Sequence, residues 1–110
     1  FFCIALAGGI AKLAYEGLKE RKLTKLQKWY IVVTDETLDG HVNYERICKE
    51  FATPLAIPKA NVLAVTSNSS TEEVARKYEV SIRDLLQSSG IPEIDLVVLE
   101  LGNEGSVCSL

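Results

Sequence analysis

The sequence predicts a single α/β domain over residues 1–110, a three-layer fold in which helices flank a four-stranded, mostly parallel sheet. Apolar runs alternate with segments of helical periodicity in the order β-α-β-α-β-α-β. Residues 61–101 show this plan most clearly, because an apolar run, a polar turn, a helical segment and a second apolar run follow one another. A length of 110 residues suits one domain with its own hydrophobic core.

The first unit begins with the apolar run FFCIALA, which we interpret as a buried strand over residues 1–7. The alternative is the stub of a signal or anchor segment, although the run is too short to cross a bilayer. Gly8 and Gly9 follow and allow a tight turn with close backbone approach to a helix or ligand. Leucines at helical spacing then predict a helix over residues 10–27.

The second unit contains the run WYIVVT, residues 29–34, which is rich in aromatic and β-branched residues. Such a run is typical of a central parallel strand covered on both faces. A polar loop follows, and an apolar stripe then predicts a helix over residues 42–51. Pro54 ends this helix, because the residue before proline avoids the α region.

The last two strands are predicted at residues 61–66 and 94–101, with the second nearer an edge of the sheet. Between them, Ser70 and Glu73 have the spacing of a capping box at a helix start. We expect this helix to break at Val80 and Ser81, and a second short helix to end with Gly90 as its left-handed cap. Residues 102–110 are predicted to be a loop and a mobile tail.

Composition and charge narrow the classes of partner. The net charge of −3 argues against a nucleic-acid-binding protein, and no segment predicts a membrane partner. Residues 1–28 carry +4 and the remainder −7, which indicates either a partner surface or an ordinary solvated helix face. The three cysteines lack metal-ligand spacing and suit a reducing compartment, so we predict a cytoplasmic protein with no cofactor and no metal.

The polar exits of the predicted strands form the candidate site. In an open parallel sheet, ligands lie beyond the carboxyl ends of the strands, where these exits converge. A fourth exit, residues 102–104, follows the last strand. The candidate ligand-binding residues are Gly8, Gly9, Thr34, Asp35, Glu36, Thr37, Thr66, Ser67, Asn68 and Ser69.

Two chemistries are open at these exits. Asp35, Glu36 and His41 could hold a divalent cation, or they form an ordinary solvated loop with a side-chain turn. The segment TSNSS, residues 66–70, could cradle an anion with helix amides and hydroxyls, or serve only as a helix cap. No complete catalytic constellation is present, so we assign no catalytic residue.

Residues 74–91, VARKYEVSIRDLLQSSGI, resemble the paired helices of lysin-motif (LysM) domains. The matching residues are Ala75, Tyr78, Val80, Ser81, Leu85 and Leu86, and the resemblance implies binding of N-acetylglucosamine glycans. The same segment is similar to a helix-turn-helix, although it carries little positive charge for a phosphate-lined groove. The strand, loop and helix NVLAVTSNSSTEEVAR resemble sugar-phosphate isomerase (SIS) domains, but residues 34–37 read TDET where that family has a serine-rich phosphate loop.

The leading hypothesis is therefore a non-enzymatic binding or regulatory module that acts through protein–protein contacts or self-association. The alternative is a domain that binds a small anionic metabolite, or a degenerate sugar-phosphate isomerase-like domain, with its site at the strand-end edge. The second alternative is LysM-like glycan binding.

Overall fold

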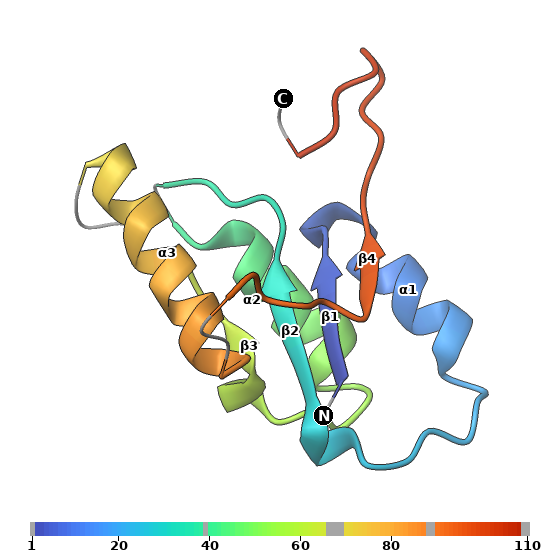
Figure 1. The fold of residues 1–110 in the computed structure, drawn as a ribbon. Helices are drawn as coiled ribbons and strands as arrows, with labels where there is room; N and C mark the ends of the chain where they lie inside the picture. The colour runs from blue at the N-terminus through green and yellow to red at the C-terminus, as the bar shows by residue number, and fades with distance from the viewer. Residues whose placement is uncertain (1, 39, 66–69, 88–89, 109–110) are drawn as a thin grey trace.

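The computed structural model describes residues 2–38, 40–65, 70–87 and 90–108. These residues form one four-stranded sheet with strand order β3-β2-β1-β4, in which every neighbouring pair is parallel (Figure 1). The strands are β1 (Phe2–Leu6), β2 (Trp29–Val33), β3 (Val62–Leu63) and β4 (Leu96–Val98). The predicted α/β fold class is confirmed.

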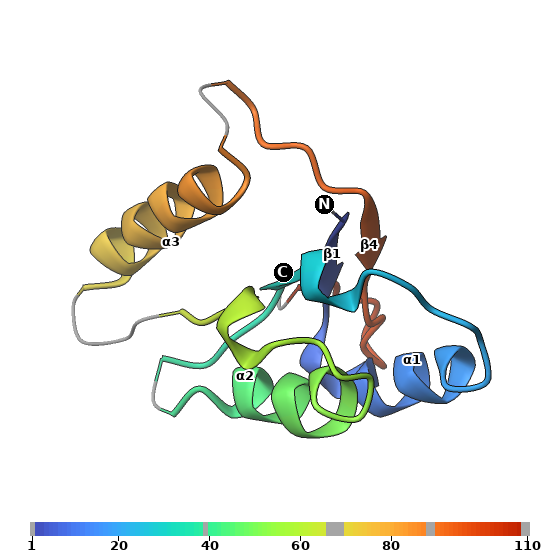
Figure 2. The same ribbon diagram turned by 90° about the horizontal axis from the view of Figure 1, so that it is seen from below.

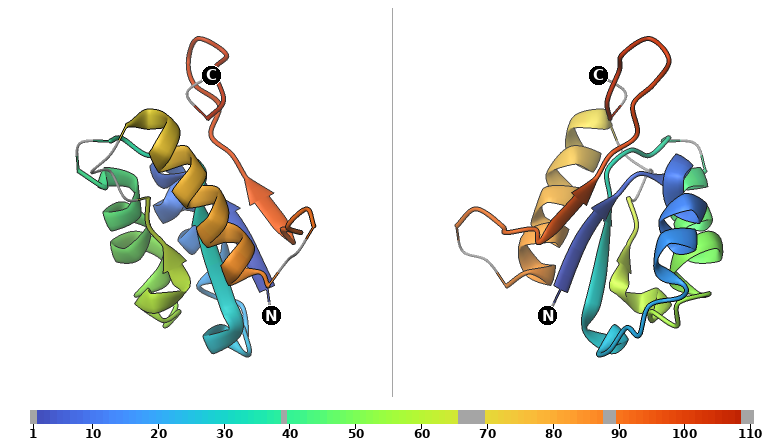
Figure 3. Two further views of the ribbon diagram at one scale, coloured as in Figure 1. Left: turned by 60° about the vertical axis from the view of Figure 1, so that its left-hand side comes forward. Right: turned by 90° about the vertical axis from the view of Figure 1, so that its right-hand side faces the viewer.

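The helices cover both faces of this sheet. They are α1 (Ala11–Leu18), α2 (Val42–Ile47) continued by a π-helical turn at Cys48–Ala52, and α3 (Thr71–Leu85), with short 3-10 turns at Gly8–Ile10, Leu26–Lys28 and Lys59–Asn61. Figures 2 and 3 show α1 and α2 on one face and α3 on the other. The result is the three-layer arrangement that the alternating pattern predicts.

The hydrophobic core lies between the sheet and the layer of α1 and α2. Its most enclosed side chains include Phe51 and Ile47 from the helical layer, packed against Ile4, Leu6 and Ile31 from the strands. On the α3 side the sheet presents the smaller residues Cys3 and Ala5, which alternate with the core residues along β1. Burial on both faces explains why β1 and β2 read as continuous apolar runs.

The helix predicted over residues 10–27 is wrong, because α1 ends at Leu18. Gly17 is a poor helix former, and the charged residues 19–22 that follow are mostly exposed. Leu23 and Leu26 still pack against the core, but they reach it from an irregular segment in which Lys25 adopts a left-handed backbone. The apolar spacing therefore predicted correctly which leucines contact the core, but it did not predict where the helix ends.

The predicted break at Val80 and Ser81 is also wrong, since α3 is continuous from Thr71 to Leu85. Neither residue is glycine or proline, so nothing interrupts the backbone hydrogen bonds of the helix. The predicted cap at Ser70 is confirmed, because its hydroxyl accepts a hydrogen bond from the amide of Glu73 at 3.4 Å. At the other end the left-handed residue is Gln87 (φ +49°), in place of the predicted Gly90.

The last strand is shorter than predicted, covering Leu96–Val98 within the predicted range 94–101. Beyond it the chain turns back, with a bridge between Leu101 and Val107. The predicted third strand likewise shrinks to Val62–Leu63. Of the helices in the described ranges, none has both the length and the apolar character that a membrane span requires. The assignment of residues 1–110 to one domain stays a prediction.

Candidate functional site

The strand order places a topological switch point between β1 and β4. The chain moves outward from β1 to β2 and β3 through α1 and α2, and then returns through α3 to pair β4 with the other side of β1. In open α/β sheets, ligands bind in the crevice at such a point, outside the carboxyl ends of the strands. The exits of β1, β2 and β4 therefore define the candidate site.

The exit of β1 is formed by Gly8 and Gly9, and each lies close to a side chain from another segment. A Cβ atom at Gly8 would collide with the side chain of Asn43, and one at Gly9 would collide with the carboxylate of Glu100. The two glycines thus let the start of α2 and the exit of β4 approach the β1 backbone closely.

Asp35, at the exit of β2, connects these segments. Its carboxylate accepts hydrogen bonds from the Gly8 amide at 3.3 Å and from the Thr34 hydroxyl at 3.4 Å. Its backbone carbonyl accepts a hydrogen bond from the side-chain amide of Asn43 at 2.7 Å. The exits of β1 and β2 and the first turn of α2 are therefore held together by Asp35 and Asn43.

Glu36 has a different role, because its carboxylate caps α2 from the preceding loop. It accepts hydrogen bonds from the amides of Thr37 at 2.9 Å, Asn43 at 3.0 Å and Tyr44 at 2.8 Å. The first amides of a helix lack partners within the helix, and its positive end favours an anion. Glu36 thus occupies the amides that a ligand anion would need at this helix.

Glu100 is the carboxylate that sequence reasoning missed. It follows the exit of β4, its side chain is exposed, and its carboxylate lies against Gly9. Glu100 was not recognised because the alternating run at residues 94–101 predicted a strand that included it, whereas β4 ends at Val98. Asn43 was missed as well, since a single amide at the start of a helix carries no motif.

The structure brings some of the predicted site residues together and not others. Hydrogen bonds join Gly8, Thr34 and Asp35, and Gly9 lies next to Gly8 and against Glu100. Glu36 instead binds the amides of α2, and the Thr37 amide donates to Glu36. The predicted residues Thr66, Ser67, Asn68 and Ser69 lie outside the described residues. Their assignment to a ligand site, like that of the others, stays a prediction.

The possible cation site at Asp35, Glu36 and His41 has no support in the described ranges, where no group of three such side chains could hold a metal ion. Glu36 is engaged by the amides of α2. His41 precedes α2 with a left-handed backbone, and its ring lies edge-on to that of Tyr44 at 6.3 Å.

The pKa values of Cys3 and Tyr78 are both raised, and Tyr78 lies at the exit of β2. Burial, and secondarily the nearby carboxylate of Asp95, raises the pKa of the Cys3 thiol to about 11. Burial also raises the pKa of Tyr78, whose hydroxyl donates a hydrogen bond to the carbonyl of Val33 at 2.8 Å. Both groups stay protonated at neutral pH, and Tyr78 fastens α3 to the end of β2.

Comparison with known proteins identifies the family. The family model described as "Glucosamine-6-phosphate isomerases/6-phosphogluconolactonase" matches residues 1–110. The chain is 34% identical to probable 6-phosphogluconolactonase 2 of Oryza sativa subsp. indica over all of its own length and 45% of that protein. It is 28% identical to human 6-phosphogluconolactonase, with 99% of the chain and 46% of that protein covered.

A solved structure supports the same assignment. The crystal structure of 6-phosphogluconolactonase from Thermotoga maritima matches with a TM-score of 0.77 and 29% identity, covering 99% of this chain and 50% of that one. The chain thus spans about half the length of the relatives it matches.

These findings correct the leading functional hypothesis. A non-enzymatic module that acts through protein–protein contacts is overturned, because the relatives named above are 6-phosphogluconolactonases. The LysM resemblance is not supported either, and the continuous α3 lacks the turn that it needs. The resemblance to sugar-phosphate isomerase domains is confirmed in its broader part, a family of sugar-phosphate enzymes. The chain belongs to the glucosamine-6-phosphate isomerase/6-phosphogluconolactonase family.

Proposed function

We propose that this chain binds a phosphorylated sugar lactone at the exits of β1, β2 and β4 and takes part in its hydrolysis to the open-chain acid. The observation that carries this proposal is the position of Gly8, Gly9, Asp35 and Glu100 at the switch point of a sheet that matches a 6-phosphogluconolactonase structure. With this proposal, the small anionic ligand that the sequence predicted as an alternative is narrowed to a sugar phosphate. We also keep the cytoplasmic location as a prediction.

The reaction requires a proton acceptor for water. Water attacks the lactone carbonyl, its proton passes to a base, and the ring C–O bond breaks as the ring oxygen takes a proton. Glu100 is suited to accept and return that proton, because its carboxylate is exposed beside Gly9 and forms no ion pair within the described residues. Asp35 instead positions the Gly8 backbone through its hydrogen bond.

The first experiment measures binding, because the chain is about half as long as its relatives. The melting temperature is followed with 6-phosphogluconate, gluconate and inorganic phosphate. We expect 6-phosphogluconate to stabilise the protein, by about 2.7 kcal/mol at 100 times its dissociation constant. Stabilisation by phosphate alone to the same degree, or by none of the three, would contradict a sugar-phosphate site.

The second experiment measures hydrolysis of 6-phosphogluconolactone through the acid it releases, relative to the spontaneous rate. Loss of general base catalysis in Glu100→Gln should lower the rate by roughly 10²–10⁴-fold. Glu93→Gln is the matched control, because Glu93 is an exposed carboxylate that precedes β4, at the end of this strand away from the exits. Equal rates for the two variants would exclude Glu100 as the base, and a wild-type rate equal to the spontaneous one would exclude lactonase activity of this chain.

A further inference from the structure

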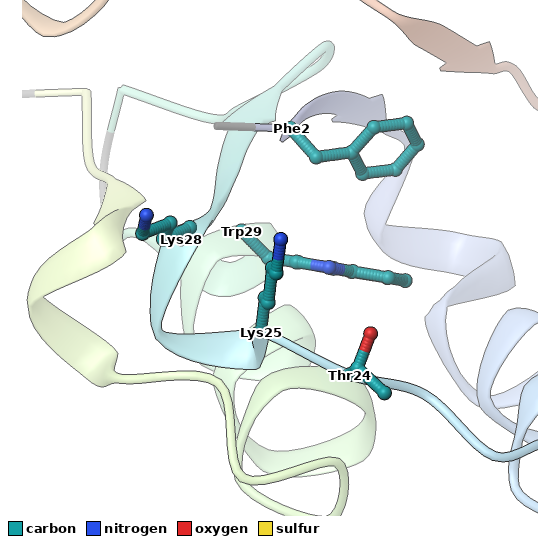
Figure 4. A pocket seen from close by; sticks show the side chains of 5 residues that line it. All are labelled: Phe2, Thr24, Lys25, Lys28 and Trp29. Carbon is teal, nitrogen blue, oxygen red and sulfur yellow. The ribbon is translucent and has the colours of Figure 1, made fainter.

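A cavity lies at the end of the sheet opposite the strand exits, and Figure 4 shows the side chains around it. It is lined by Phe2, Thr24, Lys25, Lys28 and Trp29. Phe2 and Trp29 are the first residues of β1 and β2 and are paired in register, so the cavity opens at the amino ends of these strands. Strands of five residues span about 17 Å, which separates this cavity from the lactone site proposed above.

Two aromatic rings form the apolar part of this cavity. The ring centroids of Phe2 and Trp29 are 5.0 Å apart, with an angle of 54° between the ring planes. Figure 4 shows the indole edge-on, with Lys25 beside it and Phe2 above it in this view. Both side chains are half-buried and also contact the core, which holds the rings in place. Such a pair offers a planar group a stacking surface.

Two lysines supply positive charge at the same cavity. Lys25 precedes the 3-10 turn at Leu26–Lys28 and Lys28 is its last residue, and the Lys28 amide donates a hydrogen bond to the Lys25 carbonyl at 2.9 Å. Within the described part of the chain, neither ammonium has a carboxylate within 4.0 Å. Residues 19–28 contain five basic residues and one acidic residue, so the surrounding field also attracts anions.

The combination of stacking surface, cations and size selects a class of ligand. The cavity volume is about 260 Å³, just below the roughly 300–1,000 Å³ typical of small-molecule sites, so one ring system with its anionic group fits better than a dinucleotide. We propose that this cavity binds a nucleoside monophosphate, with its base against Trp29 and Phe2 and its phosphate at Lys25 and Lys28. This site is independent of the proposed lactone site and lies too far from it to share a ligand.

Trp29 is the only tryptophan of the sequence, so its fluorescence reports on this cavity directly. The indole is excited at the red edge of its absorption band, where nucleotides do not absorb. Its emission is followed during titration with AMP, adenosine and inorganic phosphate. We expect saturable quenching by AMP, about tenfold weaker binding of adenosine because it lacks the phosphate, and no change with phosphate alone. Quenching by AMP that fails to saturate at millimolar concentrations would overturn the proposal.

Matched variants test the role of the two lysines. Lys25→Gln/Lys28→Gln should weaken AMP binding about tenfold, whereas Lys12→Gln/Lys49→Gln removes the same charge from exposed positions outside both the cavity and residues 19–28 and should leave AMP binding nearly unchanged. Equal loss in both variants would show general attraction of anions and would refute a built site. Excess 6-phosphogluconate should not displace AMP, and displacement would show that the nucleotide occupies the lactone site instead. Failure of the lactonase assay leaves these outcomes unaffected.

Discussion

The contacts of Glu36 predict that its main contribution is to stability. In Glu36→Ala, the amides of Asn43 and Tyr44 lose a charged acceptor at 3.0 and 2.8 Å in a partly buried position. Each loss should cost about 1–1.5 kcal/mol, whereas the exposed Thr37 amide regains a water partner at little cost. The free energy of unfolding should therefore fall by about 2–3 kcal/mol, above the usual cost of losing one helix cap.

Urea unfolding measured by circular dichroism tests this value. The slope of the free energy of unfolding against urea concentration should stay unchanged if the variant alters only stability. Glu36→Gln keeps one acceptor oxygen and should lose about half as much, near 1–1.5 kcal/mol. Glu45→Ala is the matched control, because Glu45 is an exposed carboxylate in the first turn of the same helix. A loss below about 0.5 kcal/mol in Glu36→Ala, or equal losses in Glu36→Ala and Glu45→Ala, would refute the capping role.

Three further predictions concern stability and the loop after β1. Burial raises the pKa of the Cys3 thiol to about 11 in the folded state, whereas the unfolded thiol has a pKa near 9.0. The unfolded state therefore loses its proton first, and the free energy of unfolding should fall by about 2–3 kcal/mol between these pH values. Cys3→Ala should make this fall smaller in urea titrations at alkaline pH. Gly8→Ala should lower the free energy of unfolding by about 1–3 kcal/mol, because the new methyl group meets Asn43, which is fixed by its bond to Asp35. Gly9→Ala displaces only the end of the exposed Glu100 side chain, so it should lower the rate of lactone hydrolysis at a nearly unchanged melting temperature. Tyr78→Phe should lose about 1–1.5 kcal/mol with its bond to Val33, measured by the urea midpoint.

The sequence was sufficient for the two central strands, because strands that are buried on both faces appear as continuous apolar runs. The apolar runs at residues 1–7 and 29–34 contain β1 and β2, and parallel pairing follows from the helices between them. Strand and helix ends were less predictable, since they depend on tertiary contacts. Leu23 and Leu26 are partly buried although neither belongs to an α-helix, and the apolar run at residues 94–101 extends beyond the three residues that pair with β1.

The candidate site could be predicted only as an edge of the sheet, because its chemistry depends on side chains that meet across three strand exits. Asp35 and Glu36 are adjacent and chemically alike, yet one contacts the β1 loop and the other caps α2. Their difference follows from where α2 begins and how closely it approaches Gly8, which no local spacing records. For the same reason, the absence of a recognisable catalytic motif did not exclude an enzyme. A site assembled from single residues on separate loops has no fixed spacing in the sequence. The expectation of a non-enzymatic module was based on the absence of a catalytic motif, and enzymes of this fold class do not need such a motif.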